Sequence, residues 1–347
     1  MSWQPSADNN QRSQLGQLKF ISQLKQRARV ISQIRAFFAL RDVLEVDTPV
    51  MSHYGVSDPH IDSIPVTFTP DGVSLNQQQE SQQQDQHKSK PMYLMSSPEY
   101  AMKRLLSAGS GSIYQIAKAF RNGEVGRRHN PEFTLLEWYR IDFDLDQLMQ
   151  EVASLIDTVL IDEALAWQFL SYRQAFKDVL SIDPLTASDD AIRAKALDYV
   201  DIKMDASTPR DTWLDLLMSH CVEPQLPKAC FIFDYPASQT ALARISLDKQ
   251  GNKVARRFEV YVNGIELANG YHELTDAKEQ QRRFEADNTH RSVLGKMPMA
   301  ADIRLLAALN AGLPECVGVA LGVERLLMLA SDEQDIAKVM AFNHHLA

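Results

Sequence analysis

The first hydrophobic pattern along the chain has the spacing of a helix. Its apolar positions are Phe20, Ile21, Leu24, Val30, Ile31, Ile34, Phe37 and Phe38. Most of this spacing places apolar side chains on one helical face, so we expect a helix over residues 20–40. Residues 43–46 have the pattern of a short strand, which Thr48-Pro49 ends.

Later segments alternate between helical and strand patterns. Helices are predicted over residues 99–106, 146–165, 189–199 and 275–289. Strands are predicted over residues 113–120, 132–139, 256–262 and 265–267, and residues 317–330 begin as a strand and continue as a helix. Asn263-Gly264 is typical of a type I′ hairpin turn. Strands joined as hairpins between helices predict an α+β fold, with a mixed, mostly antiparallel sheet flanked by helices.

Two polar segments interrupt these patterns. Residues 1–17 contain no apolar stripe and are expected to form a flexible N-terminal arm before one domain over residues 18–347. Residues 76–90 are rich in Gln and have no apolar side chain to bury, which predicts a surface loop inserted between two strands.

Composition narrows the class of protein. The chain has 36 Lys and Arg against 45 Asp and Glu, a net charge of −9, which disfavours general nucleic-acid binding. Its cysteines (Cys221, Cys230 and Cys316) form no C-x-x-C pair, which fits a reducing compartment. No apolar run approaches the ~18 residues of a membrane span. We therefore expect a cytoplasmic protein without a membrane segment.

The predicted hairpin carries two carboxylates. Its two-residue turn sets Tyr261 opposite Glu266 and Glu259 opposite Ala268, so Glu259 and Glu266 are diagonal neighbours on one face. Two carboxylates this close repel each other unless a cation lies between them. Magnesium, which binds one or two carboxylates together with substrate phosphates, meets that need. An exposed acidic sheet face is the alternative.

A second constellation is basic. Arg121 follows a strand, the polar loop behind it carries Arg127, Arg128 and His129, and Phe133 lies on the next strand. Arginine can pair with a phosphate and an aromatic ring can stack on a base, so the pattern suits a nucleotide. A solvated basic hairpin is the alternative.

A third constellation is the Gly-rich segment near the C-terminus. Gly318 and Gly322 permit a close backbone approach, and Arg325 opens the following helix. No GKS or GKT follows, and the segment is neither a P-loop nor a G-x-G-x-x-G fingerprint. A tightly packed strand–helix junction is the alternative.

In this order the segments resemble the three signature motifs of class II aminoacyl-tRNA synthetases. Motif 1 corresponds to residues 20–49, motif 2 to residues 120–133 and motif 3 to residues 318–325. Among these enzymes, the chain most resembles the lysine-specific branch, in the runs SPEY (97–100), HNPEFT (129–134), EWY (137–139) and ELANGYHEL (266–274). The resemblance covers residues 20–345.

Within this branch the chain resembles the elongation factor P–(R)-β-lysine ligases. Lysyl-tRNA synthetases have an anticodon-binding barrel before motif 1, and here motif 1 begins near residue 20, which leaves no room for it. The resemblance implies ATP-dependent activation of (R)-β-lysine as an adenylate and its transfer to a lysine of elongation factor P. It also implies a homodimer formed through motif 1, with no tRNA as partner.

The resemblance assigns roles at an ATP site. Arg121 would hold the α-phosphate and the substrate carboxylate, while His129 and Arg325 would neutralise the outer phosphates. The catalytic residues are expected to be Arg121, Arg325 and Glu266. The ATP-binding residues are expected to be Arg121, Asn122, Gly123, His129, Asn130, Phe133, Glu266, Leu267, Gly322 and Arg325. Mg²⁺ is expected on Glu259 and Glu266.

The resemblance also assigns a pocket for the diamino acid. Glu99 would take the amino group near the carboxylate, and Glu273 and Tyr139 the distal ammonium. Ala320 stands where the tRNA enzymes carry Gly, and its methyl would favour an amino group one carbon further along. The substrate-binding residues are expected to be Ser97, Pro98, Glu99, Tyr139, Asn269, Tyr271, Glu273 and Ala320.

One position departs from the family pattern. The glutamate expected two residues after Arg121 is Gly123 here, and Glu124 follows one step later. Glu124 either takes over its contact with ATP through a shifted loop, or the site is weakened. Two other functions therefore stay open: an enzyme that charges tRNA, and a degenerate paralogue that acts as a binding module.

Overall fold

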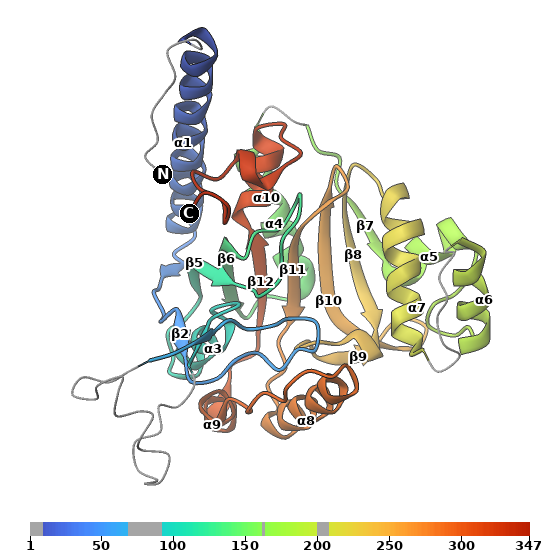
Figure 1. Cartoon of the computed structure of the whole chain (residues 1–347). Coiled ribbons are helices and arrows are strands. Elements are labelled where there is room, and N and C mark those ends of the chain that lie inside the picture. Colours follow the sequence, from blue (N-terminus) through green and yellow to red (C-terminus); the bar gives the residue numbers. More distant parts are fainter. Residues whose placement is uncertain (1–9, 69–91, 162–163, 200–207) are drawn as a thin grey trace.

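A mixed sheet forms the centre of the computed structural model, which describes residues 10–68, 92–161, 164–199 and 208–347 (Figure 1). Its order is β1-β5-β6-β12-β11-β10-β8-β7, and β9 pairs with β10. The strands are β1 (Leu44–Glu45), β5 (Ile113–Phe120), β6 (Glu132–Ile141), β7 (Gln168–Ser171), β8 (Ala229–Pro236), β9 (Ile245–Leu247), β10 (Lys253–Val262), β11 (Ile265–His272) and β12 (Cys316–Gly322). The β1–β5 and β7–β8 pairs are parallel and the other pairs are antiparallel. The prediction of a mixed, mostly antiparallel sheet is confirmed.

Helices flank this sheet, as the α+β prediction requires. They are α1 (Asn10–Ala39), α3 (Glu99–Ser107), α4 (Leu145–Val159), α5 (Tyr172–Leu180), α6 (Asp189–Tyr199), α7 (Arg210–Leu217), α8 (Ala277–Val293), α9 (Ile303–Gly312) and α10 (Val323–Ala330). A small second sheet has the order β2-β4-β3, from β2 (Met51–Ser52), β3 (Pro65–Val66) and β4 (Met92–Leu94).

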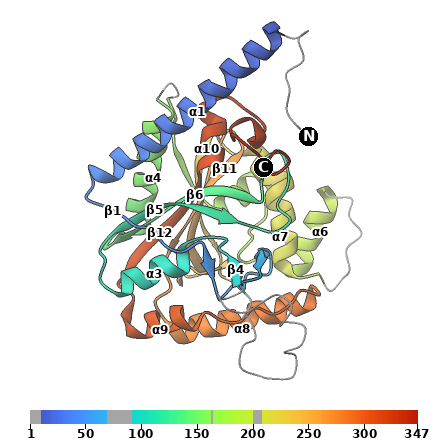
Figure 2. The same cartoon turned by 60° about the vertical axis from the view of Figure 1, so that its left-hand side comes forward.

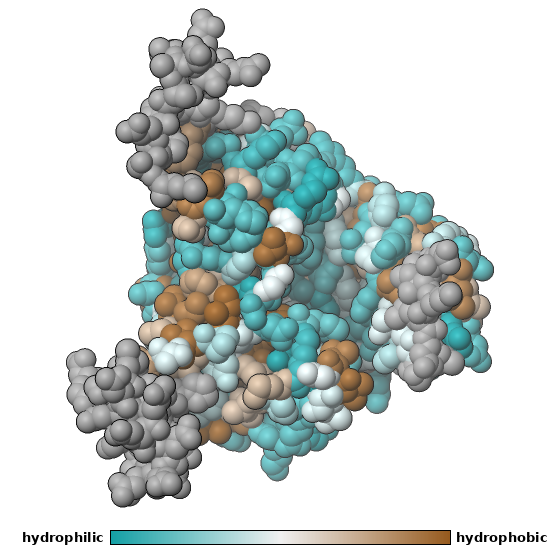
Figure 3. All heavy atoms as spheres, in the orientation of Figure 1, coloured by the Kyte–Doolittle hydropathy of each residue, from teal (hydrophilic) through white to brown (hydrophobic). Residues whose placement is uncertain are grey.

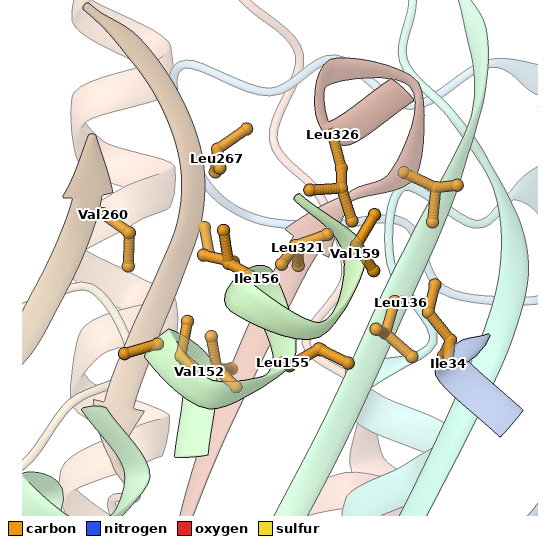
Figure 4. Close-up of a cluster of buried hydrophobic side chains, with 14 of the residues drawn as sticks. Ile34, Leu136, Val152, Leu155, Ile156, Val159, Val260, Leu267, Leu321 and Leu326 are labelled. Carbon is orange, nitrogen blue, oxygen red and sulfur yellow. The ribbon is translucent and has the colours of Figure 1, made fainter. Parts of the chain in front are cut away.

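One face of the central sheet is covered by α1, α4 and α10 (Figure 2). Ile34 of α1, Leu155 and Ile156 of α4 and Leu136 of β6 meet there, each 0% exposed (Figure 4). Alternate residues of a strand point to opposite faces of a sheet. The residues between these apolar positions therefore point to the second face.

Two further clusters border that second face. The helices α5, α6 and α7 pack with β8 around Phe176, Ile192 and Trp213. At the lower edge in Figure 1, α3, α8 and α9 pack together around Met102 and Phe284. The second face lies between these clusters, where side chains from the sheet border a cavity.

The structure corrects several predicted boundaries. The first helix begins at Asn10 rather than near residue 20, because a polar segment without an apolar stripe can still continue a helix. It also includes part of the expected arm, whose residues 1–9 lie outside the described residues. The helix expected to reach residue 165 ends at Val159, although the apolar pattern continues. The Gln-rich segment 76–90 also lies outside the described residues, between β3 and β4.

The hairpin strands are longer than predicted and their pairing is shifted. Asn263 and Gly264 have φ angles of 51° and 69°, as a type I′ turn requires. A bulge then shifts the pairing between Val260 and Tyr261, so that Glu259 lies opposite Asn269. The predicted pairing of Glu259 with Ala268 is wrong, because an extra residue of β11 is accommodated in the bulge.

None of the helices in the described part of the chain is both long enough and apolar enough to cross a membrane.

The packing between the sheet and its helices predicts how much stability is lost when a core side chain is truncated. Leu136→Ala should lower the free energy of unfolding by about 2–5 kcal/mol, since Leu136 is fully buried between helices and sheet. Denaturant unfolding measures this loss. Leu40→Ala, at a position 85% exposed, is the control and should change stability by less than about 0.5 kcal/mol. Equal losses in both variants would contradict this packing.

Candidate active site

A cavity with a volume of about 520 Å³ lies on the second face of the sheet. Figure 3 shows a hollow among hydrophilic residues on this side of the molecule. Its walls include side chains from the sheet, α3, α8 and the segment 56–61. Fifteen of the predicted site residues line it: Ser97, Glu99, Arg121, His129, Asn130, Phe133, Tyr139, Glu266, Leu267, Asn269, Tyr271, Glu273, Ala320, Gly322 and Arg325.

Strand alternation explains why these residues meet. In β6, Leu136 and Trp138 belong to the core, while Glu137 and Tyr139 line the cavity. In β11 the bulge changes this period, so that Glu266 and Asn269, three positions apart, both line the cavity. The bulge thus adds an amide beside the two carboxylates predicted on this hairpin.

Four predicted site residues do not line the cavity. Pro98 precedes the first residue of α3. The backbone N–H of Asn122 donates to the carbonyl of Asp62 (2.8 Å). Gly123 has a φ of 78°, and Glu259 lies in a hydrogen-bond network behind the cavity wall.

Glu124, the residue after Gly123, reaches the cavity. Gly123 adopts the left-handed backbone conformation that glycine tolerates best. Beyond it, Glu124 lines the cavity with its Oε1 atom 3.5 Å from Nη1 of Arg121. The geometry fits the interpretation that Glu124 takes over from position 123.

One end of the cavity is cationic. Arg325 contacts His129 (Nη2–Nε2, 2.9 Å) and donates to the carbonyl of Glu266 (2.8 Å). The guanidinium of Arg121 lies over the ring of Phe133, 5.0 Å from its centre. Burial and the charge of Arg325 lower the pKa of His129. A polyanion beside these groups would relieve their mutual repulsion.

The other end holds three carboxylates and one ammonium. Lys103 Nζ lies 2.6 Å from Glu99 Oε1 and 2.7 Å from Glu273 Oε2. Glu137 accepts hydrogen bonds from Ser97 and from Tyr139, each at 2.7 Å. Lys103, Glu137 and Glu273 are at most 2% exposed. The carboxylates therefore outnumber the only cation that pairs with them among the described residues.

Burial changes the protonation of this cluster. It raises the pKa of Glu137 to about 8, and the negative charge of Glu99 adds to the shift. Burial likewise raises the pKa of Glu273 to about 7, against the opposing charge of Lys103. Burial alone favours neutral Lys103, but the charges of Glu273 and Glu99 outweigh it and raise its pKa. A ligand with two ammonium groups would favour the ionised form of these carboxylates.

Both carboxylate oxygens of Glu259 accept hydrogen bonds from other side chains of the protein. One oxygen accepts hydrogen bonds from Arg257 and from the Asn269 amide (3.3 Å). The other accepts from the hydroxyls of Tyr235 and Tyr261, both at 2.7 Å. A carboxylate has about four acceptor positions, so in this arrangement Glu259 fits a metal ligand only if one donor is displaced.

Glu266 is the carboxylate that fits a magnesium ligand. Its Oε2 atom has one long contact, 3.4 Å from Nη1 of Arg325, and it lines the cavity. Burial and the nearby charge of Glu259 raise the pKa of Glu266 to about 7, a shift that a cation would reverse. Among the described residues no group of three or more His, Cys, Asp or Glu could hold a metal ion. Binding would therefore depend on Glu266 together with substrate phosphates.

Sequence reasoning missed two buried members of the carboxylate cluster. Glu137 stands two residues before Tyr139, so strand alternation could have placed it on the same face. Lys103 lies one helical turn after Glu99, a spacing that predicts a side-chain contact but not its burial. Its second partner, Glu273, comes from a distant segment, and no local pattern indicates that contact.

Comparisons with known proteins identify the family of this chain. Residues 10–345 match the family of tRNA synthetases class II (D, K and N). An elongation factor P–(R)-β-lysine ligase of Proteus mirabilis is 49% identical over 98% of this chain and 97% of its own length. Proteins of the same name from Vibrio atlanticus and Salmonella paratyphi B are 47% identical over 98% of this chain, and over 98% and 97% of their own lengths.

The raised pKa of Glu137 predicts a pH dependence of stability. Between its usual pKa of 4.5 and its folded pKa of about 8, the unfolded chain releases a proton that the folded protein retains. Stability therefore falls as pH rises through this window. Glu137→Gln removes the effect, so its stability relative to the parent should be greater at pH 8 than at pH 5, by at least about 1 kcal/mol.

Denaturant unfolding at the two pH values measures this difference. Glu285→Gln, an exposed position on α8, is the matched control and should show the same relative stability at both. If the difference in unfolding free energy between Glu137→Gln and the parent is also the same at pH 5 and pH 8, the protonation assigned to the cluster is contradicted.

Proposed function

Because the chain belongs to the class II tRNA synthetase family (D, K and N), and within it to the elongation factor P–(R)-β-lysine ligases, we propose that it joins (R)-β-lysine to a lysine of elongation factor P at the expense of ATP. The observation that carries this proposal is a single cavity with a cationic end and a carboxylate end. ATP fits the first end, and an acid with two ammonium groups fits the second.

The first step activates the amino acid. Arg121 holds the substrate carboxylate against the α-phosphate of ATP, while His129 and Arg325 neutralise the outer phosphates. The carboxylate oxygen attacks the α-phosphorus, and pyrophosphate leaves with the bonding electrons. Holding both reactants in one cavity makes this attack effectively unimolecular. A magnesium ion held by Glu266 would supply further positive charge at the phosphates.

The carboxylate end selects a diamino acid. Glu99 takes the amino group nearer the reacting carboxylate, and Glu273 with Tyr139 takes the distal ammonium. Glu137 supports Tyr139 through its hydrogen bond to the phenol. Because Lys103 already neutralises one charge of this cluster, the remaining carboxylates match the two positive charges of the ligand.

The second step transfers the acyl group. The amino group of the acceptor lysine attacks the acyl carbon of the adenylate, and AMP leaves. Side chains expected to perform the first step, Arg121, Glu266 and Arg325, meet at one cavity, which argues against a degenerate paralogue. The names of the relatives favour a protein acceptor over tRNA.

We also propose a cytoplasmic homodimer. On α1, the helix that includes motif 1, Phe20, Ile21 and Leu24 are 36%, 47% and 38% exposed. A partner subunit would cover such apolar positions. An elongation factor as acceptor fits an enzyme of the cytoplasm.

A direct assay tests the proposed reaction. Incubation with ATP, (R)-β-lysine and elongation factor P should add one β-lysyl group to the factor, seen by intact-protein mass spectrometry. Arg325→Met should slow ATP–pyrophosphate exchange by about 100-fold or more, because it removes a charge beside the phosphates. Arg282→Met, whose side chain is 70% exposed on α8, is the control and should exchange at the parent rate.

Two outcomes would contradict the proposal. Acylation of tRNA without modification of elongation factor P would favour the tRNA enzyme, and absence of exchange with (R)-β-lysine would favour the binding module.

Ala320 predicts the preference between the two lysine isomers. It lines the cavity between Glu137 on β6 and Asn269 on β11. Ala320→Gly should move the ratio of kcat/KM for (R)-β-lysine over α-lysine toward α-lysine by about 10-fold or more, the usual effect of one carbon in a pocket. Exchange assays with each isomer measure this ratio. An unchanged ratio would show that the methyl does not determine selectivity.

A further inference from the structure

A short segment borders the cavity, which is lined in part by its residues Val56, Ser57, Asp58, His60 and Ile61. This mouth loop, residues 53–63, follows β2 and passes in front of the sheet above α8 (Figure 1). Asp62 pairs with Arg291 (3.2 Å) at the end of α8 and with Lys296 (2.9 Å) just beyond it. The Asp62 carbonyl accepts from the N–H of Asn122 (2.8 Å), next to Arg121. The mouth loop is therefore fixed from both sides.

His60 lies on the mouth loop, where it is exposed and lines the cavity. Its backbone N–H donates to Asp58 Oδ1 (2.7 Å), and its ring lies edge-on to that of His290, with centres 5.9 Å apart. The titratable groups around it are Asp58 on the loop, Asp287 and His290 on α8, and Asp215 on α7. Burial and the charge of Asp211 raise the pKa of Asp215, and a proton on His60 would oppose this shift.

The mouth loop lies beside the part of the cavity that we assign to the reacting carboxylate of the diamino acid. Tyr54, Gly55 and Val56 of the loop line a small pocket together with Ser97 and Glu99. Glu99 is the residue assigned to the amino group nearer the carboxylate. With ATP at the cationic end and the diamino acid at the carboxylate end, an acceptor can approach the acyl carbon past the mouth loop.

The acceptor amine requires a base. A lysine side chain is an ammonium near neutral pH and cannot attack a carbonyl until it loses a proton. Imidazole is the side chain suited to accept one at this pH. Two histidines line the cavity among the described residues. His129 contacts Arg325 at the phosphate end, which leaves His60 for the acceptor side.

We propose that His60 is the general base of the transfer step. This inference rests on the proposed function and extends it. The acceptor ammonium gives one proton to the imidazole of His60, and the free amine attacks the acyl carbon. A C–N bond forms, the bond from that carbon to the phosphate oxygen breaks, and AMP departs. The second proton on nitrogen passes to the departing phosphate oxygen or to water, and His60 then releases its proton to solvent.

The test separates transfer from activation. Enzyme loaded with (R)-β-lysyl adenylate is mixed with elongation factor P, and single-turnover transfer is followed across pH. His60→Gln should slow transfer at pH 7 by about 100-fold, and the rate should keep rising at higher pH, where the acceptor amine loses its proton without help. ATP–pyrophosphate exchange should stay within about twofold, because general-base loss affects only the later step.

Two controls make the experiment specific. His53→Gln changes an exposed histidine of the same loop that does not line the cavity, and transfer should be unaffected. Hydroxylamine, which is already largely uncharged at neutral pH, should capture the adenylate at the same rate in His60→Gln and the parent. Imidazole added to His60→Ala should restore part of the transfer rate.

Unchanged transfer in His60→Gln would overturn the inference, as would an equal loss of exchange or of hydroxylamine capture. If the parent enzyme forms the adenylate but modifies no elongation factor P, the proposed function fails, and the inference fails with it.

Discussion

The structure of the site depends on one buried ion cluster. Lys103, 1% exposed, places its ammonium between the carboxylates of Glu99 and Glu273. Removing three charged groups from water costs several kcal/mol per ion unless they are paired and hydrogen-bonded. The pairing links α3 to the end of β11, so the same contacts that offset this cost set the distance between two carboxylates that we propose bind the substrate. The pocket therefore contains charged groups, already paired with one another, before any ligand arrives.

Two glycines allow aromatic rings to pack against the strands of this sheet, one on the pocket face and one on the core face. A Cβ on Gly318 would lie 2.4 Å from the ring of Tyr139 and 2.6 Å from a carboxylate oxygen of Glu273. On the opposite, core face of the sheet, a Cβ on Gly270 would lie 2.4 Å from the ring of Phe258 on the neighbouring strand. Both positions must lack a side chain because aromatic rings pack directly on the backbone. In the Gly-rich segment, Gly318 allows the ring of Tyr139 to pack against the backbone, and Gly322 lies next to Arg325.

The sequence predicted the site better than it predicted the contacts that hold the site together. The hairpin register predicted Glu266, and the resemblance to a known family named Tyr139 and Ala320; all three line the cavity. The bulge that sets Asn269 opposite Glu259 depends on how two strands pair, and no local pattern encodes it. Lys103 has the sequence context of a surface helix residue, and its burial follows from the way α3 packs against the sheet.

Motif 1, motif 3 and the residue that follows motif 2 meet at one carboxylate. Glu324, 2% exposed, pairs with Arg27 of α1 (2.9 Å) and accepts a hydrogen bond from the N–H of Thr134 on β6 (2.8 Å). Arg27 also donates to the hydroxyl of Thr134 (2.7 Å). Phe133 precedes Thr134, and Arg325 follows Glu324. Helix α1 therefore contacts the direct neighbours of Phe133 and Arg325, the two residues assigned to the nucleotide. A partner subunit packed against α1 would influence the positions of Phe133 and Arg325 through these contacts.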